Sequence, residues 1–115
     1  MAAGGLNNTT HQMTPADLNL ILAGARTSTV VCLYYTASWC GACKKIEPLI
    51  QSFVNKYDDL EMYKTDADVS KELLDAHAVK KLPTFVFFKN GQPHATHEGA
   101  NPQAVAATFS RLLIE

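Results

Sequence analysis

The chain has 115 residues, of which 47% are hydrophobic, and a formal net charge of −1 at pH 7. This size and composition favour one compact domain with its own core. The near-neutral charge argues against nucleic acid or an anionic membrane as a partner, and no apolar run approaches the roughly 18 residues of a membrane span.

The first dozen residues predict no leader peptide. They are small and polar, lack the apolar centre of a secretory signal, and contain no arginine that would indicate a transit peptide. The chain has three cysteines, and in a reducing compartment a Cys-x-x-Cys pair is usually catalytic or metal-binding. We therefore expect a cytoplasmic protein in which residues 1–11 form a flexible extension.

The first regular elements can be placed from local signals. Thr14-Pro15-Ala16-Asp17 indicates a helix start, with the threonine as N-cap, the proline in the first turn and an acid soon after. This helix should end near Gly24, and we expect a short strand at Thr9–Met13 before it. The run Val30–Thr36 is apolar without clean alternation, which is typical of a central strand buried on both faces.

The rest of the chain alternates between helix and strand patterns. Apolar spacing predicts a helix over about Gly41–Tyr57, interrupted by Pro48, which should bend it. The further elements are a strand at Leu60–Thr65, a helix after the cap residues Asp66–Ser70, strands at Thr84–Phe88 and Pro93–Glu98 joined by an Asn90-Gly91 turn, and a helix opened by Asn101-Pro102. The predicted fold class is α/β with a mixed sheet.

The chemistry of the chain is concentrated in Ser38-Trp39-Cys40-Gly41-Ala42-Cys43-Lys44, where a predicted strand ends and a helix begins. Backbone N–H groups are unpaired at a helix N-terminus and the helix dipole is positive there, so both features favour a thiolate. Residues three apart share one helix face, so the sulfurs of Cys40 and Cys43 can reach each other. The pattern favours a disulfide that opens and closes.

Two other interpretations of the cysteine pair are weaker. Structural zinc needs four ligands, but the third cysteine, Cys32, lies inside a strand pattern, and His94 and His97 should point to opposite faces of theirs. A purely structural disulfide is disfavoured by the missing leader and by the short loop it would close. We interpret Cys32 as a small buried hydrophobe and the histidines as surface residues.

With these elements in place, the sequence from about Gln12 onward resembles the thioredoxin family. The motifs that carry the resemblance are, in order, Trp39-Cys40-Gly41-Ala42-Cys43-Lys44, Pro48, Leu82-Pro83-Thr84, Phe87-Phe88-Lys89-Asn90-Gly91 and Gly99. The resemblance implies a thioredoxin domain over residues 12–115, with helices on both faces of a central mixed sheet. It also implies a thiol–disulfide oxidoreductase that reduces protein disulfides, acts as a monomer, holds no prosthetic cofactor and is recycled by a partner reductase drawing on NADPH.

The resemblance assigns a role to each matching residue. Cys40 would attack the substrate disulfide and Cys43 would resolve the mixed disulfide. Pro83 matches the family's cis-proline, and the backbone of Leu82 would pair with an extended substrate strand. The remaining expected binding residues are Trp39, which flanks the sulfurs, Gly41 and Ala42, which keep the turn between them small, and Gly99, which leaves room for the substrate.

Plainer interpretations of several residues stay open. Pro83 could be a trans proline of an edge strand, and Trp39 an ordinary core residue. Gly91 is interpreted as a turn residue only. We hypothesise that the lysines near the two motifs form a basic rim that favours acidic partners, although a solvated face explains them equally well. These lysines are Lys44, Lys45, Lys80 and Lys81.

Two positions depart from the family pattern. Ala42 stands where the family usually has proline, and we expect the altered turn to change the reduction potential. Tyr34 stands six residues before Cys40, where the family commonly buries an acid that helps to deprotonate the resolving thiol, and no acid of that segment can substitute. A phenol is not a base at neutral pH.

We therefore hypothesise that resolution by Cys43 relies on solvent or on a substrate group and is slower than in typical members of the family. The alternative function is a thioredoxin-fold scaffold or redox-gated adaptor with weak or no turnover. The substitutions at Tyr34 and Ala42 keep that alternative open.

Overall fold

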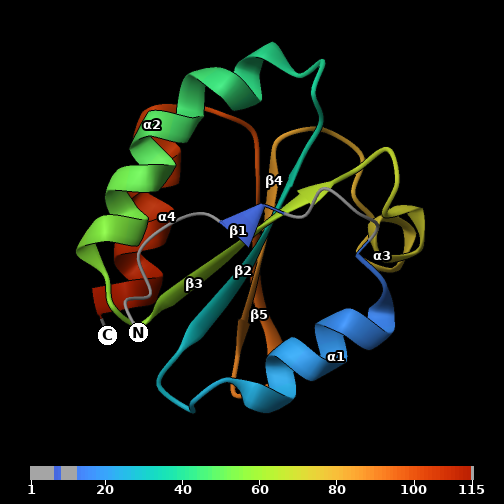
Figure 1. Ribbon diagram of the computed structural model, residues 1–115. Coiled ribbons are helices and arrows are strands. Elements are labelled where there is room, and N and C mark those ends of the chain that lie inside the picture. The colour runs from blue at the N-terminus through green and yellow to red at the C-terminus, as the bar shows by residue number, and fades with distance from the viewer. Residues whose placement is uncertain (1–6, 9–12, 115) are drawn as a thin grey trace.

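The computed structural model describes residues 7–8 and 13–114. Within them, one sheet has the strand order β1-β3-β2-β4-β5 and carries helices on both faces (Figure 1). The elements are β1 (Asn7–Asn8), α1 (Pro15–Gly24), β2 (Val30–Thr36), α2 (Gly41–Lys56), β3 (Leu60–Asp66), α3 (Lys71–Ala76), β4 (Thr84–Lys89), β5 (Gln92–Glu98) and α4 (Pro102–Ile114). β1, β3 and β2 run parallel, whereas β4 is antiparallel to both β2 and β5. The mixed α/β sheet predicted from the sequence is confirmed.

β2 is the central strand and is buried along its whole length, as its unbroken apolar run predicts. Its side chains alternate between two cores. Cys32 and Tyr34 lie in the core under α2 and α4, and Leu33 and Tyr35 lie in the core under α1 and α3. Figure 1 shows these two helix pairs on opposite sides of the sheet. Successive residues of one strand therefore serve different faces of the molecule.

The residues at the N-termini of α1 and α2 explain where these two helices begin. The Thr14 hydroxyl accepts a hydrogen bond from the Asp17 N–H at 3.1 Å, and the Asp17 carboxylate accepts one from the Thr14 N–H at 3.0 Å. This reciprocal capping box begins α1 where the sequence predicts it. α2 begins directly after Cys40, which is its N-cap residue. The first cysteine of the pair therefore stands at the helix N-terminus.

The N-terminal region differs from the prediction at one point. Asn7 and Asn8 pair with Tyr63 and Lys64 of β3, so these two residues belong to the sheet rather than to a flexible extension. The domain boundary at residue 12 stays a prediction. The strand expected at Thr9–Met13 falls almost wholly outside the described residues.

The turn between β4 and β5 has the backbone that its sequence predicts. Asn90 and Gly91 have φ angles of 56° and 75°, and a two-residue hairpin loop with both positions in the left-handed region twists in the sense that the strands require. Gly91 is therefore explained as a turn residue. Among the described helices, none has both the length and the apolar character needed to cross a membrane.

Candidate active site

Three chain segments meet at the C-terminal end of β2. The parallel register pairs Thr36 with Asp66, so β2 and β3 end side by side. The antiparallel register pairs Tyr35 with Thr84, the first residue of β4, so Leu82-Pro83 approaches the same end of β2. Loops at the carboxyl ends of strands are where α/β sheets most often place their sites. The cysteine motif, the loop after β3 and Leu82-Pro83 are therefore neighbours.

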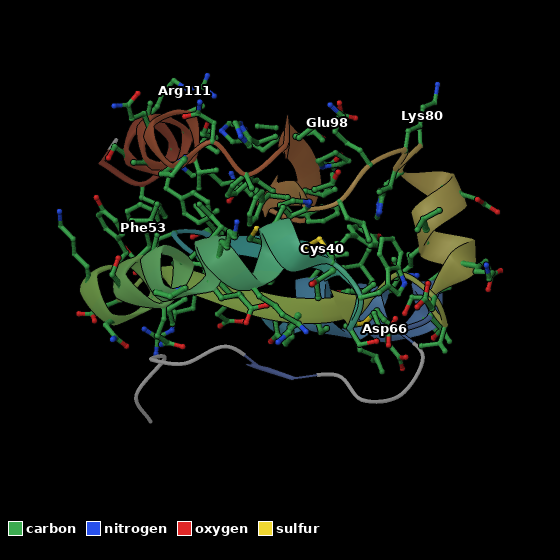
Figure 2. The ribbon with its side chains drawn as sticks, turned by 90° about the horizontal axis from the view of Figure 1, so that it is seen from above. Cys40, Phe53, Asp66, Lys80, Glu98 and Arg111 are labelled. Carbon is green, nitrogen blue, oxygen red and sulfur yellow. A yellow bond between two sulfur atoms is a disulfide. The ribbon has the colours of Figure 1, made fainter. Side chains whose placement is uncertain are left out.

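Cys40 and Cys43 are joined by a disulfide in the first turn of α2 (Figure 2). Their Cα atoms are 5.3 Å apart, and the Cys43 N–H donates a hydrogen bond to the Cys40 sulfur at 3.2 Å. Cys40 is 6% exposed and Cys43 is fully buried. The Cys40 sulfur thus accepts one of the unpaired N–H groups of the helix N-terminus, an arrangement that stabilises a thiolate.

Trp39 lies on the surface beside the disulfide, with 68% of its area exposed. Its indole N–H donates a hydrogen bond to the Asp68 carboxylate at 2.9 Å. This bond ties the cysteine motif to the loop after β3. The interpretation of Trp39 as a core residue is wrong, and Asp68 was missed because its nearness to Trp39 follows from the pairing of β2 with β3 and not from sequence spacing.

The Leu82–Pro83 peptide bond is cis, and Pro83 is buried. The Pro83 carbonyl accepts a hydrogen bond from the Gly99 N–H at 2.9 Å. Gly99 has a φ angle of 101°, which glycine adopts without strain, and an added Cβ there would meet no atom within 4 Å. Since β4 lies between β2 and β5, Pro83 does not introduce an edge strand. Gly99 and Pro83 are brought together with open space beside them.

A pocket of about 470 Å³ lies next to Trp39 and Leu82 and reaches toward α3. Its charged lining residues are Lys71, Lys80, Lys81, Asp68 and Asp75, so it carries both signs of charge. Lys44 and Lys45 are exposed on α2 and are not among the lining residues. The proposed basic rim is therefore divided between two places, and its pocket half includes acids that the hypothesis did not consider.

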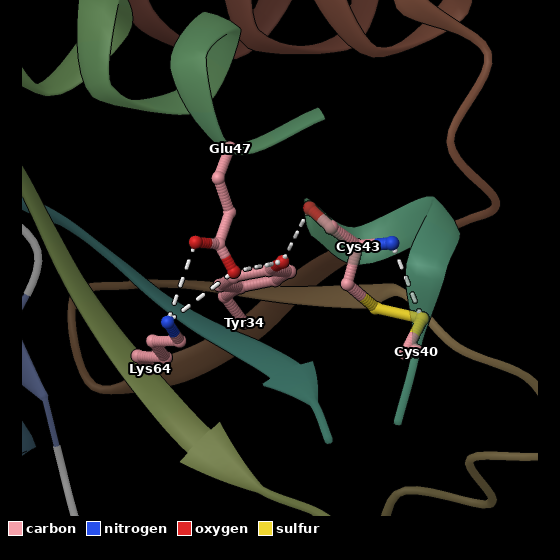
Figure 3. A network of polar contacts seen from close by, with 5 residues as sticks. All are labelled: Tyr34, Cys40, Cys43, Glu47 and Lys64. Atoms are coloured by element: carbon pink, nitrogen blue, oxygen red, sulfur yellow. Dashed lines mark hydrogen bonds and ion pairs between the residues drawn. A yellow bond between two sulfur atoms is a disulfide. The ribbon is translucent and has the colours of Figure 1, made fainter. Parts of the chain in front are cut away.

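Behind the disulfide, Tyr34 contacts a carboxylate from the next turn of α2 (Figure 3). The Tyr34 hydroxyl lies 2.9 Å from Glu47 Oε2 and 3.2 Å from the Cys43 carbonyl oxygen, both of which can accept its hydrogen. Lys64 Nζ lies 3.3 Å from each carboxylate oxygen of Glu47. The segment that carries Tyr34 contains no acid, as stated above, but Glu47 lies outside that segment and reaches Tyr34 from α2.

The Tyr34 hydroxyl is a hydrogen-bond donor and not a base. Burial raises its pKa far above the ordinary phenol value. Thr36 partly opposes this rise by hydrogen bonding, and the hydrogen bond and negative charge of Glu47 raise the pKa further. The neutral phenol therefore links the Glu47 carboxylate to the backbone of Cys43 at physiological pH.

Comparison with known proteins matches this geometry to a family. A model of the thioredoxin family matches residues 9–111 of the chain. The chain belongs to the thioredoxin family. The thioredoxin resemblance and the thioredoxin fold inferred from the sequence are thereby confirmed, and the chain is a thiol–disulfide oxidoreductase of the protein-disulfide class.

Individual relatives agree with the family match. Thioredoxin-1 of Saccharomyces cerevisiae is 40% identical over 81 residues, which are 70% of this chain and 78% of the relative. The X-ray structure of Fasciola hepatica thioredoxin has a TM-score of 0.78 at 30% identity and covers 85% of this chain and 93% of its own. A peptide-N(4)-(N-acetyl-beta-glucosaminyl)asparagine amidase of Caenorhabditis elegans is 32% identical over 90 residues. Those residues are 78% of this chain but only 15% of the amidase.

The third cysteine of the chain lies in the core. Cys32 is fully buried and is a free thiol. Burial raises its pKa well above the ordinary thiol value, so it stays protonated and unreactive in the folded state. The interpretation of Cys32 as a small hydrophobe is confirmed.

The histidines are not all surface residues. His94 is exposed as expected, but His77 and His97 are half-buried. His77 Nδ1 lies 2.8 Å from the Tyr35 hydroxyl, and His97 Nδ1 lies 3.1 Å from the Thr108 hydroxyl. Both were misassigned because each lies where helix and sheet pack together. Among the described residues, no group of three or more histidine, cysteine or acidic side chains could hold a metal ion.

Proposed function

We propose that Cys40 is the nucleophile of this oxidoreductase and Cys43 its resolving cysteine. The Cys40 thiolate attacks one sulfur of a protein disulfide, forms a mixed disulfide and releases one substrate thiolate. The deprotonated Cys43 then attacks the Cys40 sulfur, so that the Cys40–Cys43 disulfide forms and the second substrate thiolate leaves. The observation that carries this assignment is the contrast between the two sulfurs. Cys40 retains 6% exposure and accepts a helix N-terminal N–H, whereas Cys43 is fully buried.

We further propose that the substrate strand lies along Leu82 and Pro83. Main-chain pairing with Leu82 would hold an extended peptide whatever its side chains are. The open space at Gly99 supports this path, since Gly99 donates its N–H to the Pro83 carbonyl. Gly41 and Ala42 are exposed and small, so they leave the Cys40 sulfur accessible. Trp39 would cover the other side of the bound peptide.

The electron source and setting are part of the same proposal. The family match supports recycling by a reductase that draws on NADPH, and we propose the cytoplasm as the compartment and a monomer as the working form. The free thiol of Cys32 agrees with a reducing environment. NADPH oxidation in the presence of a thioredoxin reductase and a disulfide-bonded protein measures this recycling directly.

The assignment is tested by turnover of a disulfide-bonded protein with three cysteine variants. Cys40→Ser should abolish turnover and form no mixed disulfide. Cys43→Ser should also abolish turnover but should accumulate a mixed disulfide that gel electrophoresis without reductant detects. Cys32→Ala is the matched control and should retain turnover, because the Cys32 thiol is buried and is not part of the disulfide.

Two results would contradict the proposal. Sustained turnover by Cys40→Ser would remove the nucleophile assignment. Undiminished binding of a partner protein by the variant without Cys40 and Cys43, together with negligible turnover of the unmodified chain, would instead favour the adaptor function.

A further inference from the structure

Cys43 presents a problem of proton transfer. In the proposed reaction its thiol must lose a proton before it can attack Cys40, yet Cys43 is fully buried. Desolvation disfavours the thiolate at such a position, and bulk water has no direct access to it. An acceptor close to Cys43 would therefore accelerate the resolving step.

Glu47 is placed to be that acceptor. It lies four residues after Cys43 on α2, and side chains four apart on a helix stand one above the other on the same face. Its carboxylate accepts from the Tyr34 hydroxyl, which also lies within hydrogen-bond distance of the Cys43 carbonyl. Figure 3 shows Tyr34 between the Glu47 carboxylate and the main chain of Cys43. The carboxylate is thus held next to the turn that carries the resolving cysteine.

Glu47 also has a route by which the proton can leave. Its side chain is 25% exposed and that of its partner Lys64 is 32% exposed. The Glu47 carboxylate is therefore partly exposed and can exchange a proton with bulk water, whereas the buried Cys43 thiol cannot. Lys64 Nζ lies 3.3 Å from the carboxylate, so the ion pair holds Glu47 at the boundary between the core and the solvent.

We propose that the Glu47 carboxylate, positioned by Tyr34 and Lys64, takes the proton of the Cys43 thiol during resolution of the mixed disulfide. The Cys43 sulfur keeps the electron pair of its S–H bond and attacks the Cys40 sulfur. The bond between Cys40 and the substrate breaks, and its electron pair leaves with the substrate thiolate. Protonated Glu47 then returns its proton to the solvent or to the departing thiolate. The proposal rests on the cysteine roles assigned above.

Among the described residues, few other titratable groups lie around this position. Tyr34 comes from β2 and Lys64 from β3, while Cys40 belongs to the N-terminus of α2 itself. Cys32 shares the buried core and stays protonated. β4 and α4 contribute phenylalanines to this core, and His97 of β5 lies behind one of them, Phe85. Glu47 is the carboxylate that the Tyr34 hydroxyl connects to the main chain of Cys43.

The test separates the two chemical steps with 5,5′-dithiobis(2-nitrobenzoate). Attack by Cys40 releases a first coloured thiolate, and resolution by Cys43 releases a second, so stopped-flow absorbance records both. Glu47→Gln should leave the first phase unchanged within about twofold. Its second phase at pH 7 should be slower by at least about tenfold. This lower bound is set below the roughly 10²–10⁴-fold typical of a general base because solvent can partly take over as the proton acceptor. The deficit should shrink as pH rises, since hydroxide then deprotonates Cys43.

A charge-matched control distinguishes the position of the carboxylate from its charge. The double variant Glu47→Gln/Gln51→Glu keeps the net charge but moves the carboxylate one turn further from Cys43, and it should remain slow in the second phase. Far-UV circular dichroism and urea denaturation establish that each variant is folded. Recovery of the second phase by the double variant would overturn the assignment to Glu47.

Two further results decide the outcome. An unchanged pH profile of the second phase in Glu47→Gln would refute the proposal, and so would equal slowing of both phases, because that indicates a general structural defect. Failure of the underlying cysteine roles has a different signature. In that case Cys43→Ser would still release the second thiolate, or Cys40→Ser would still show a rapid first phase.

Discussion

Burial sets the protonation state of a tyrosine and a histidine on the α3 side of the sheet. The Tyr35 hydroxyl and His77 Nδ1 are 2.8 Å apart, and the His77 ring also lies edge-on to Phe88. Burial raises the pKa of Tyr35 and lowers that of His77. A neutral imidazole can accept the phenol's hydrogen at Nδ1, whereas a protonated imidazole has only donors. Burial therefore favours neutral His77, whose Nδ1 can accept the hydrogen of the Tyr35 hydroxyl.

A dependence of stability on pH follows from this lowered pKa. Unfolded His77 binds its proton near the ordinary value of about 6.5, and the folded form binds it only at lower pH. The stability that His77 contributes is therefore fully present above about pH 6.5. It is lost as the pH falls through the pKa of His77 in the folded state. Burial of His97 acts in the same direction, partly opposed by Glu98. Urea denaturation at pH 8, 6.5 and 5, followed by circular dichroism, should show decreasing stability.

Two histidine variants make that measurement specific. His77→Gln should flatten the decrease, because it removes one of the two groups responsible. His94→Gln is the control and should leave the decrease unchanged, since His94 is exposed. If His77→Gln retained the full decrease, the Tyr35–His77 pair would not be its source.

Among the helices, α1 has the most explicit start signal. Its capping box joins Thr14 and Asp17 by reciprocal hydrogen bonds, and α1 lies on the face of the sheet opposite α2 (Figure 1). Thr14→Ala should lower the free energy of unfolding by about 1 kcal/mol, as the loss of an N-cap usually does. Turnover should not change, because the cap lies across the sheet from the helix that carries the cysteines (Figure 1).

The control for this helix is Thr14→Ser, which keeps the hydroxyl. Urea denaturation should place Thr14→Ser close to the unmodified chain and Thr14→Ala clearly below it. Equal stability of the serine and alanine variants would mean that the hydroxyl does not stabilise α1.

The elements were predictable to different degrees, for physical reasons. β2 was predictable from its unbroken apolar run. α1 and the β4–β5 turn were predictable from cap and turn residues, because those signals are local in the sequence. The Tyr34–Glu47 contact was not predictable from spacing, because it joins a strand to a helix and depends on how α2 lies over the sheet. The Trp39–Asp68 bond was missed for the same reason, since it depends on the pairing of β2 with β3. The site contacts that could not be predicted from the sequence are thus mostly tertiary contacts between separate elements.

At the scale of the whole molecule, one phenylalanine of α4 joins the helices to the sheet. Phe109 is fully buried, stacks on Phe53 of α2 at 4.8 Å between ring centroids, and meets Phe85 and Phe87 of β4 edge-on at 5.7 and 5.1 Å. Cys43 belongs to the same core cluster. The packing that holds α4 in place therefore also supports the helix that carries the active site.

Phe109→Ala should cost about 3–5 kcal/mol of unfolding free energy, the usual range for a buried phenylalanine. That is a large share of the roughly 5–15 kcal/mol that stabilises a typical domain. Leu113→Ala, on the same helix but only partly buried, is the control and should cost less. Chemical denaturation measures both, and comparable losses would show that Phe109 has no special place in the core.

β5 forms one edge of the described sheet, and most of its side chains face solvent. Its register is irregular opposite Phe87 and Phe88, and Pro93 has no N–H with which to recruit another strand. Edge strands with such features resist sheet-to-sheet aggregation. If a substrate strand pairs with Leu82 as proposed, these features of β5 direct extended chains to the backbone beside the sulfurs and away from the edge of the sheet.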